Sequence, residues 1–93
     1  MAMNPKLIDV VAILKPIAPD QLIMVEPEYE SIELPIGLVG TIVEIYQHEE
    51  PYQYLIEFSD DQGNEFAMAL LPANDFVVLR YQLNENSKDL VSL

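Results

Sequence analysis

Few side chains in this 93-residue chain could take part in catalysis. The chain has no cysteine, and its one histidine, His48, lies in a polar stretch beside Glu49 and Glu50. A serine or threonine nucleophile needs an activating base, and none of the hydroxyl residues stands in a recognisable catalytic motif. We therefore expect His48 to be a solvated loop residue. The sequence predicts that the protein is not an enzyme and has no catalytic residues.

Paired carboxylates occur at Glu49–Glu50 and at Asp60–Asp61. Two carboxyl groups hydrolyse a glycoside only when they face each other across a cleft, about 5–9.5 Å apart, with one of them in an apolar setting. Neighbouring acids in a turn are equally solvated and do not meet that condition. The stretch from Asp60 to Glu65 resembles part of a calcium loop but lacks its alternating spacing and its late glutamate. We expect no metal site and no cofactor, with weak surface binding of divalent cations as the alternative.

The charge of the chain is strongly negative. Asp and Glu number 16 against 4 Lys and Arg, which gives a net charge of -12, and no basic residue occurs between Lys15 and Arg80. Nucleic acids and anionic membranes both require clustered cations, so we expect neither as a partner. An acidic surface attracts basic proteins instead. A basic protein partner is therefore expected, and the alternative is that the charge only keeps a small apolar domain in solution.

The expected cellular compartment is inferred from features that the sequence lacks. The apolar run of residues 7–14 is interrupted by Asp9 and is too short to span a membrane. It is also unlike the long apolar stretch of a secretory signal, and a chain without cysteine forms no disulfides. The expected localisation is cytoplasmic.

Apolar and polar residues alternate with a period of two, which is typical of β-strands. The clearest cases are residues 53–58 and 65–70, which a turn at residues 59–64 joins into a hairpin that ends in a glycine bulge at Gly63. We expect further strands at 8–14, 38–46 and 76–81, with one helical turn at 72–75. Gly40 indicates a bulge or bend in its strand. The side chains predicted to face the core are Val10, Ile13, Thr41, Val43, Ile45, Tyr54, Ile56, Phe58, Phe66, Met68 and Leu70.

Residues 20–34 form the unusual segment of the chain. Its first part, residues 20–25, is predicted to be either an extra strand or an open loop. Acidic residues then alternate with apolar ones, and so long a connection in a small domain is often functional. The predicted partner-binding residues are Glu26, Glu28, Tyr29, Glu30 and Glu33.

Four short motifs together resemble a known family. They are D-V-V-A-I-L at residues 9–14, G-L-V-G-T-I-V-E at 37–44, I-E-F at 56–58 and L-P-A at 71–73. This combination resembles a family of short bacterial proteins that is catalogued only as a domain of unknown function. The order of the elements resembles an SH3-like small barrel of about five antiparallel strands, with one short helical turn before the last. The resemblance implies a fold and no activity.

Two functions from different classes remain after these exclusions. The first is a non-catalytic acidic domain that binds another protein, of the inhibitor or antitoxin/immunity type. The alternative is a self-assembling structural domain that forms a homodimer by strand addition, through residues 20–34 or 90–93. In either case the expected domain organisation is a barrel over residues 1–82, with the insertion 20–34, and a polar C-terminal tail over residues 83–93.

Overall fold

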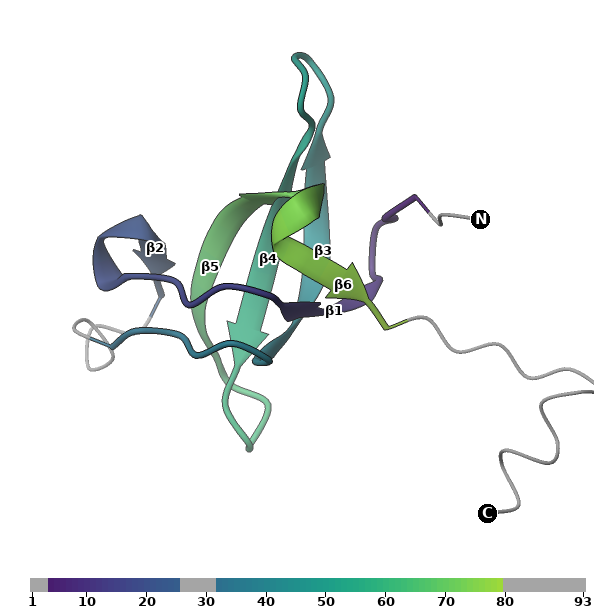
Figure 1. Cartoon of the computed structure of the whole chain (residues 1–93). Helices are drawn as coiled ribbons and strands as arrows, with labels where there is room; N and C mark the ends of the chain where they lie inside the picture. The colour runs from purple at the N-terminus through teal and green to yellow at the C-terminus, as the bar shows by residue number, and fades with distance from the viewer. Residues whose placement is uncertain (1–3, 26–31, 80–93) are drawn as a thin grey trace, which may run out of the picture.

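The fold is known from a computed structural model, which describes residues 4–25 and 32–79. It is mainly β, with one antiparallel sheet in the order β2-β5-β4-β3-β1-β6 (Figure 1). Single 3₁₀ turns, η1 (Pro19–Gln21) and η3 (Ala73–Asp75), precede β2 and β6. The six strands are β1 (Val10–Ile13), β2 (Leu22–Met24), β3 (Val39–Tyr46), β4 (Gln53–Ser59), β5 (Glu65–Pro72) and β6 (Phe76–Val78).

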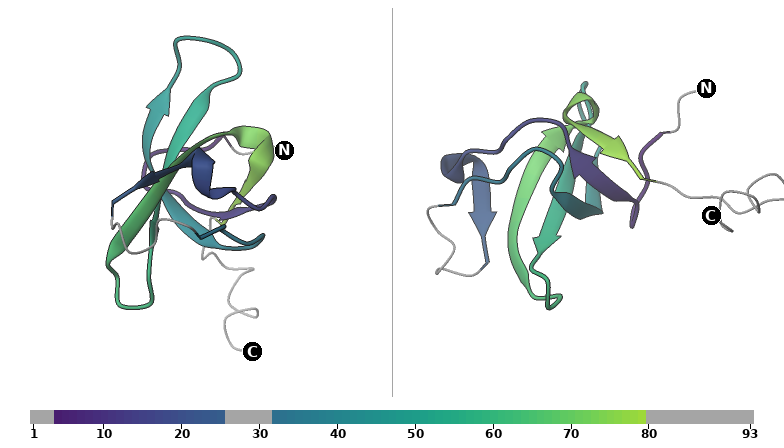
Figure 2. Two further views of the ribbon diagram at one scale, coloured as in Figure 1. Left: turned by 90° about the vertical axis from the view of Figure 1, so that its left-hand side faces the viewer. Right: turned by 60° about the horizontal axis from the view of Figure 1, so that its bottom comes forward.

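The expected fold class is confirmed, and the sheet has one strand more than the five that were counted. The additional strand is β2, so residues 22–24 form a strand and not an open loop. The sheet is strongly twisted, with the β3–β4 and β4–β5 turns at opposite ends (Figure 2). Its two end strands are β2 and β6, and they do not pair with each other within the described residues. The closed SH3-like barrel therefore stays a prediction.

The β4–β5 hairpin forms as its turn residues predict. The carboxylate of Asp60 accepts hydrogen bonds from the backbone N–H groups of Gln62 (3.0 Å) and Asn64 (2.9 Å), which closes the turn. Gly63 has a φ of 84°, a conformation that favours glycine. The register shifts between Phe58 and Ser59, so the extra residue is Phe66 and the bulge is not the glycine bulge expected at Gly63. The carboxylate of Asp60 therefore stabilises the turn.

Bulges also explain why several core predictions are wrong. In β3, Ile42 pairs with Ile56 but Glu44 already pairs with Leu55, so Val43 is an extra residue on its strand. Ile42 is consequently buried, whereas the predicted Thr41 and Val43 are only partly buried. Beyond the bulge the alternation is reversed, and Ile45 packs against the core as predicted.

The bulge in β5 has the same effect on the following residues. Phe66 is extra, because Phe58 pairs with Ala67 while Ser59 pairs with Glu65. Ala67 and Ala69 therefore face the core. The predicted core residues Met68 and Leu70 point outward, and their assignment to the core is wrong.

In β1 the core residues are Val11 and Ile13, and the prediction of Val10 is wrong. Residues 10–14 are apolar without interruption, so the run itself does not distinguish the two faces of its strand. Pairing decides instead, because Val11 lies opposite Gly40 of β3. At Gly40 a Cβ atom would lie 2.6 Å from Cγ2 of Ile56 and 2.9 Å from Cδ1 of Phe58. The absence of a side chain at Gly40 allows β3 and β4 to approach closely. The bulge expected at Gly40 lies three residues later in β3.

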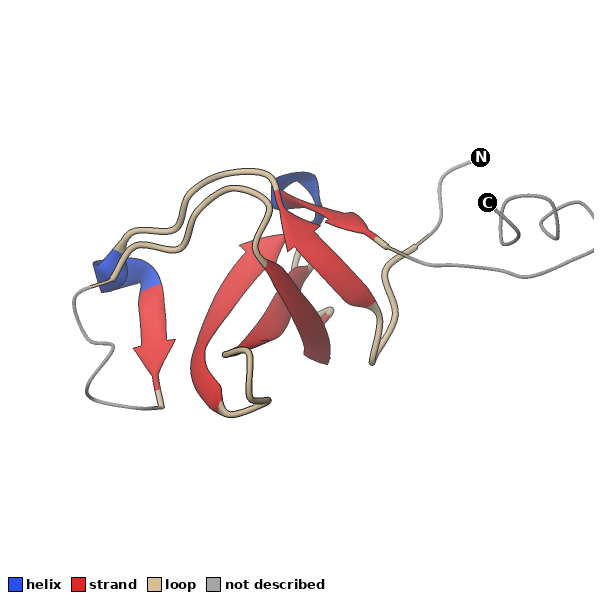
Figure 3. Cartoon of the chain, turned by 90° about the horizontal axis from the view of Figure 1, so that it is seen from below, coloured by secondary structure: helices blue, strands red, loops and turns tan. Residues whose placement is uncertain are grey.

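The core lies on the concave side of the curved sheet. Tyr54 and Phe76 contact each other edge to face, with ring centroids 5.4 Å apart. Ile17 and Leu34 join residues 14–21 to residues 32–38 by two reciprocal backbone hydrogen bonds of 2.9 Å, and Figure 3 shows these two loops side by side. The base of the insertion is therefore part of the core. The buried set is Val11, Ile13, Ile17, Leu34, Ile42, Tyr54, Ile56, Phe58, Phe66, Ala67, Ala69 and Phe76.

Candidate functional site

The predicted partner-binding segment begins at the edge of the sheet. Val25, the last described residue before it, donates its backbone N–H to the carbonyl oxygen of Phe66 in β5 (2.9 Å). Glu33, at the other end, is exposed beside the buried Leu34. The segment therefore leaves the fold next to β5 and returns into the core. Glu26, Glu28, Tyr29 and Glu30 lie outside the described residues.

Beside that point, the outward side chains of β2, β5 and β4 form an exposed apolar surface. Ile23 pairs with Met68, and Leu70 pairs with Leu55. Ile23 is 51% exposed and Leu70 46% exposed. We call these four residues, together with Glu57 and Glu65, the acid-bordered face.

Glu57 and Glu65 are the two charged residues of this face, and they interact directly. The pKa of the Glu57 carboxyl is raised above its ordinary value, first because the protonated group donates a hydrogen bond to Glu65. Partial burial and the negative charge of Glu65 raise this pKa further. The bulge at Phe66 brings Glu65 to the outward side of β5, on the same side as Glu57.

This arrangement suits recognition of a cation beside an apolar contact. Two neighbouring carboxyl groups can both accept charge-assisted hydrogen bonds from one lysine or arginine side chain. The apolar neighbours provide area to bury around it. The alternation of residues 53–58 already indicated that Glu57 points away from the core. Its pairing with Glu65 was missed, because it depends on a bulge that the sequence pattern does not show.

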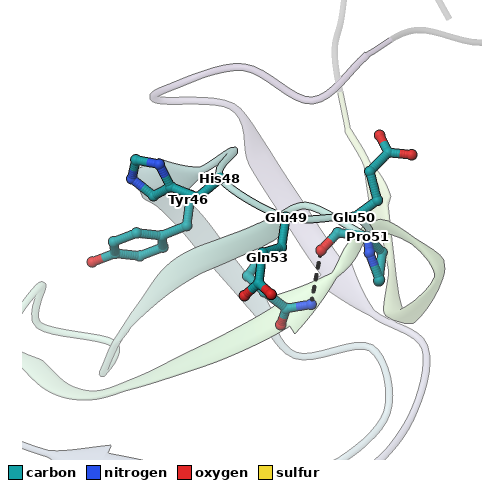
Figure 4. A pocket seen from close by; sticks show the side chains of 6 residues that line it. All are labelled: Tyr46, His48, Glu49, Glu50, Pro51 and Gln53. Atoms are coloured by element: carbon teal, nitrogen blue, oxygen red, sulfur yellow. Dashed lines mark hydrogen bonds between the residues drawn. The ribbon is translucent and has the colours of Figure 1, made fainter.

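His48 lies on the loop between β3 and β4, as expected from its polar surroundings. The loop surrounds an open hollow of about 330 Å³, lined by Tyr46, His48, Glu49, Glu50, Pro51 and Gln53. Figure 4 shows the carboxyl groups of Glu49 and Glu50 turned to different sides of the loop. His48 is exposed, and the hydrogen bond drawn in this hollow joins the amide of Gln53 to the carbonyl oxygen of Pro51 (3.5 Å). The hollow thus does not bring two acids together for general acid–base chemistry.

A second, smaller hollow of about 190 Å³ lies where residues 15–21 cross near β5 and η3. Lys15 forms an ion pair with Asp75 there, with 3.1 Å between Nζ and Oδ1. Across residues 4–25 and 32–79, no three potential metal-ligating acids or histidines gather into one group. The same residues include no helix with the length and apolar character needed to cross a membrane.

Comparison with known proteins adds a family to this description. Searches of curated proteins and of solved structures gave no match. The sequence pattern of one family, described as "Domain of unknown function (DUF4926)", matches residues 7–78, which include all six strands. This match confirms the resemblance carried by the four sequence motifs. The chain belongs to this family, the domain of unknown function DUF4926.

Proposed function

We propose that the protein is a non-catalytic, acidic interaction domain that binds a basic protein through the acid-bordered face. The observation that carries the proposal is the position of Glu57 and Glu65 on the same outward side of the sheet, beside the exposed Ile23 and Leu70. The acidic segment of residues 26–33 starts next to this face, so both acidic regions can contact one partner. A protein of this kind acts as an inhibitor or antitoxin/immunity factor, which covers the basic surface of an enzyme or toxin.

Binding would proceed in two physical steps. The net charge of -12 attracts a basic partner over long range and raises the association rate. A lysine or arginine of the partner then lies between the carboxyl groups of Glu57 and Glu65 and forms charge-assisted hydrogen bonds with both. Apolar side chains of the partner cover Ile23 and Leu70, which lowers the dissociation rate.

The absence of catalysis belongs to the same proposal. The chain has no cysteine, and its one histidine is exposed on a loop away from the acid-bordered face. A chain without cysteine also suits the reducing cytoplasm, which is the compartment we propose.

The experiment uses the intact chain, labelled with ¹⁵N, and a short synthetic peptide with lysine at every second position and threonine or leucine between. We expect saturable shifts of the amide signals of Ile23, Glu57 and Met68. The matched control peptide has glutamine in place of each lysine and should bind at least about tenfold more weakly, because it lacks the charge. Equal binding of the two peptides, or shifts centred on the His48 loop, would reject this face as a basic-partner site.

A further inference from the structure

A second exposed surface adjoins the acid-bordered face, on the outward side of β3, β1 and β6. Its register places Ala12 between Val39 and Val77, and Val10 beside Thr41. Leu79 continues this surface, because its backbone N–H donates to the carbonyl oxygen of Val10 (2.8 Å). We call the side chains of Val10, Ala12, Val39, Thr41, Val77 and Leu79 the uncharged face.

The composition of the uncharged face is unusual for this chain. Four of its members, Val10, Val39, Val77 and Leu79, are between 41% and 48% exposed. None of its six side chains carries a charge, although the whole chain has 16 acidic residues. Contiguous exposed apolar side chains on a sheet mark a surface that another chain covers.

The uncharged face ends at an open strand edge. Within the described residues, β6 pairs with β1 alone. The N–H groups of Leu79 and Leu14 donate to the carbonyl oxygens of Val10 and Asp75, and such bonds alternate along an antiparallel pair. The backbone N–H and C=O groups of Phe76 and Val78 consequently point away from β1, toward the free edge. An edge of this kind is a template for pairing with another strand.

We propose that the occupant of this edge is β6 of a second copy of the chain, paired antiparallel about a two-fold axis at Val77. Two copies that each carry a charge of -12 repel each other wherever acids face acids. The uncharged face is where this repulsion is weakest, and its apolar side chains would lie next to those of the second copy. A basic partner would gain no ion pair on this face. This interface goes beyond the proposed function, because it uses none of the residues of the acid-bordered face.

The alternating hydrogen bonds define the register of this pair. Phe76 lies opposite Val78 of the partner subunit, so that the free N–H and C=O groups of both residues are satisfied. Val77 then faces Val77 of the partner subunit in a non-hydrogen-bonded position, where Cα atoms are about 4.5 Å apart. The two copies of Leu79 are four residues apart along the strand direction, which separates them by about 14 Å.

A disulfide test follows from these two distances, because the chain has no other cysteine. Val77→Cys places two sulfur atoms within bonding range, whereas Leu79→Cys, on the same face and similarly exposed (47% against 44%), exceeds the limit of about 7 Å between Cα atoms. Under mild oxidation at micromolar concentration, we expect Val77→Cys to form a covalent dimer at least about tenfold faster than Leu79→Cys. Equal rates, or no dimer from either variant, would overturn the proposed pairing.

Light scattering on the unaltered chain provides an independent measurement. We expect a mass of twice 10.6 kDa at micromolar concentration. We expect a monomer for Val77→Lys, which brings two like charges together at the axis, and a dimer for the control Ile36→Lys, which changes an exposed turn residue outside both faces. A monomeric unaltered chain overturns the proposal, whether residues 80–93 of the chain itself or a different protein covers the uncharged face. A dimer that persists in Val77→Lys overturns it as well.

Discussion

The acid-bordered face and the uncharged face lie on the same side of one sheet, and both expose aliphatic side chains to a similar degree. They differ because the acid-bordered face carries two carboxyl groups and the uncharged face carries none. Glu57 and Glu65 stand beside Ile23, Met68 and Leu70, whereas Val10, Val39 and Val77 have no charged neighbour within their own face. In a chain of net charge -12, we propose that this difference decides which partner each face accepts. Apolar area favours association on both faces, and charge selects between a basic protein and a second copy.

The comparison also separates the two functions that the sequence left open. A basic-partner domain and a self-assembling domain need not exclude each other when they use different surfaces of the sheet. The two faces meet where Thr41 of β3 pairs with Glu57 of β4, but the proposed pairing uses the outer edge of β6, which β1 and β3 separate from β4. A dimer formed at β6 would therefore leave both copies of the acid-bordered face free to bind.

The largest expected effect comes from a change that disturbs the sheet beneath both faces. In Gly40→Ala the new Cβ would lie 2.6 Å from Ile56 and 2.9 Å from the carbonyl oxygen of Glu57, so one strand must move. We expect the free energy of unfolding to fall by about 1–3 kcal/mol, measured by urea denaturation. The neighbouring control Val39→Ala, at an exposed position, should cost no more than about 0.5 kcal/mol. Similar losses in the two variants would show that the strands around Gly40 are not closely packed.

The next largest effect is a salt dependence of opposite sign on the two faces. Raising sodium chloride from about 20 mM to about 500 mM shortens the distance over which charges interact to less than the width of either face. The dissociation constant of the lysine peptide should rise by about tenfold, because attraction is screened. The dissociation constant of the dimer should fall several-fold, because repulsion is screened. Titration calorimetry and sedimentation equilibrium measure the two constants, and a change of the same sign in both would contradict the assignment of charge to one face.

The parts of the fold that follow from local chemistry were predicted correctly. The turn at Asp60–Asn64 was correctly predicted because its hydrogen bonds join residues at most four positions apart. The same holds for the single helical turn at η3. The inward direction of Tyr54, Ile56 and Phe58 was also predicted correctly, because inward and outward side chains alternate without interruption along β4.

The faces of β3 and β5 could not be predicted in the same way. One extra residue, Val43 or Phe66, reverses the alternation of all residues beyond it. Each bulge arises from the pairing of two strands, and the periodicity of a single strand carries no record of it. The carboxyl pair of the acid-bordered face depends on one of these bulges. The uncharged face depends on the pairing of β1 with β6, which are more than sixty residues apart in sequence.

A smaller effect is expected from neutralising the carboxyl pair. The double variant Glu57→Gln and Glu65→Gln keeps the shape and hydrogen-bonding capacity of both side chains but removes their charge. The exposed ion pair that one lysine forms with this carboxyl pair contributes about 0.2–1 kcal/mol, so the lysine peptide should bind about 1.5- to 5-fold more weakly. The dissociation constant of the dimer should change little. The control double variant Glu49→Gln and Glu50→Gln removes two exposed acids of the β3–β4 loop, and an equal loss of peptide binding in this variant would mean that only total charge matters.

The smallest effect concerns the raised pKa of Glu57. The pKa of Glu57 is raised in the folded chain from its ordinary value of 4.5, so the folded state holds the Glu57 proton more tightly than the unfolded state does. Glu57 therefore makes the free energy of unfolding fall as the pH rises above 4.5 through the raised pKa. Binding of the lysine peptide should strengthen over the same range, because the Glu57 carboxyl becomes charged.

The variant Glu65→Gln isolates this contribution, because its amide can donate to the Glu57 carboxylate and carries no negative charge. We expect the pKa of Glu57, followed by NMR of its side-chain carboxyl carbon, to move back toward its ordinary value. The pH dependence of stability that Glu57 contributes should disappear with it. A Glu57 pKa that stays raised in Glu65→Gln would mean that burial dominates, and that the two carboxyl groups of the acid-bordered face do not act as a pair.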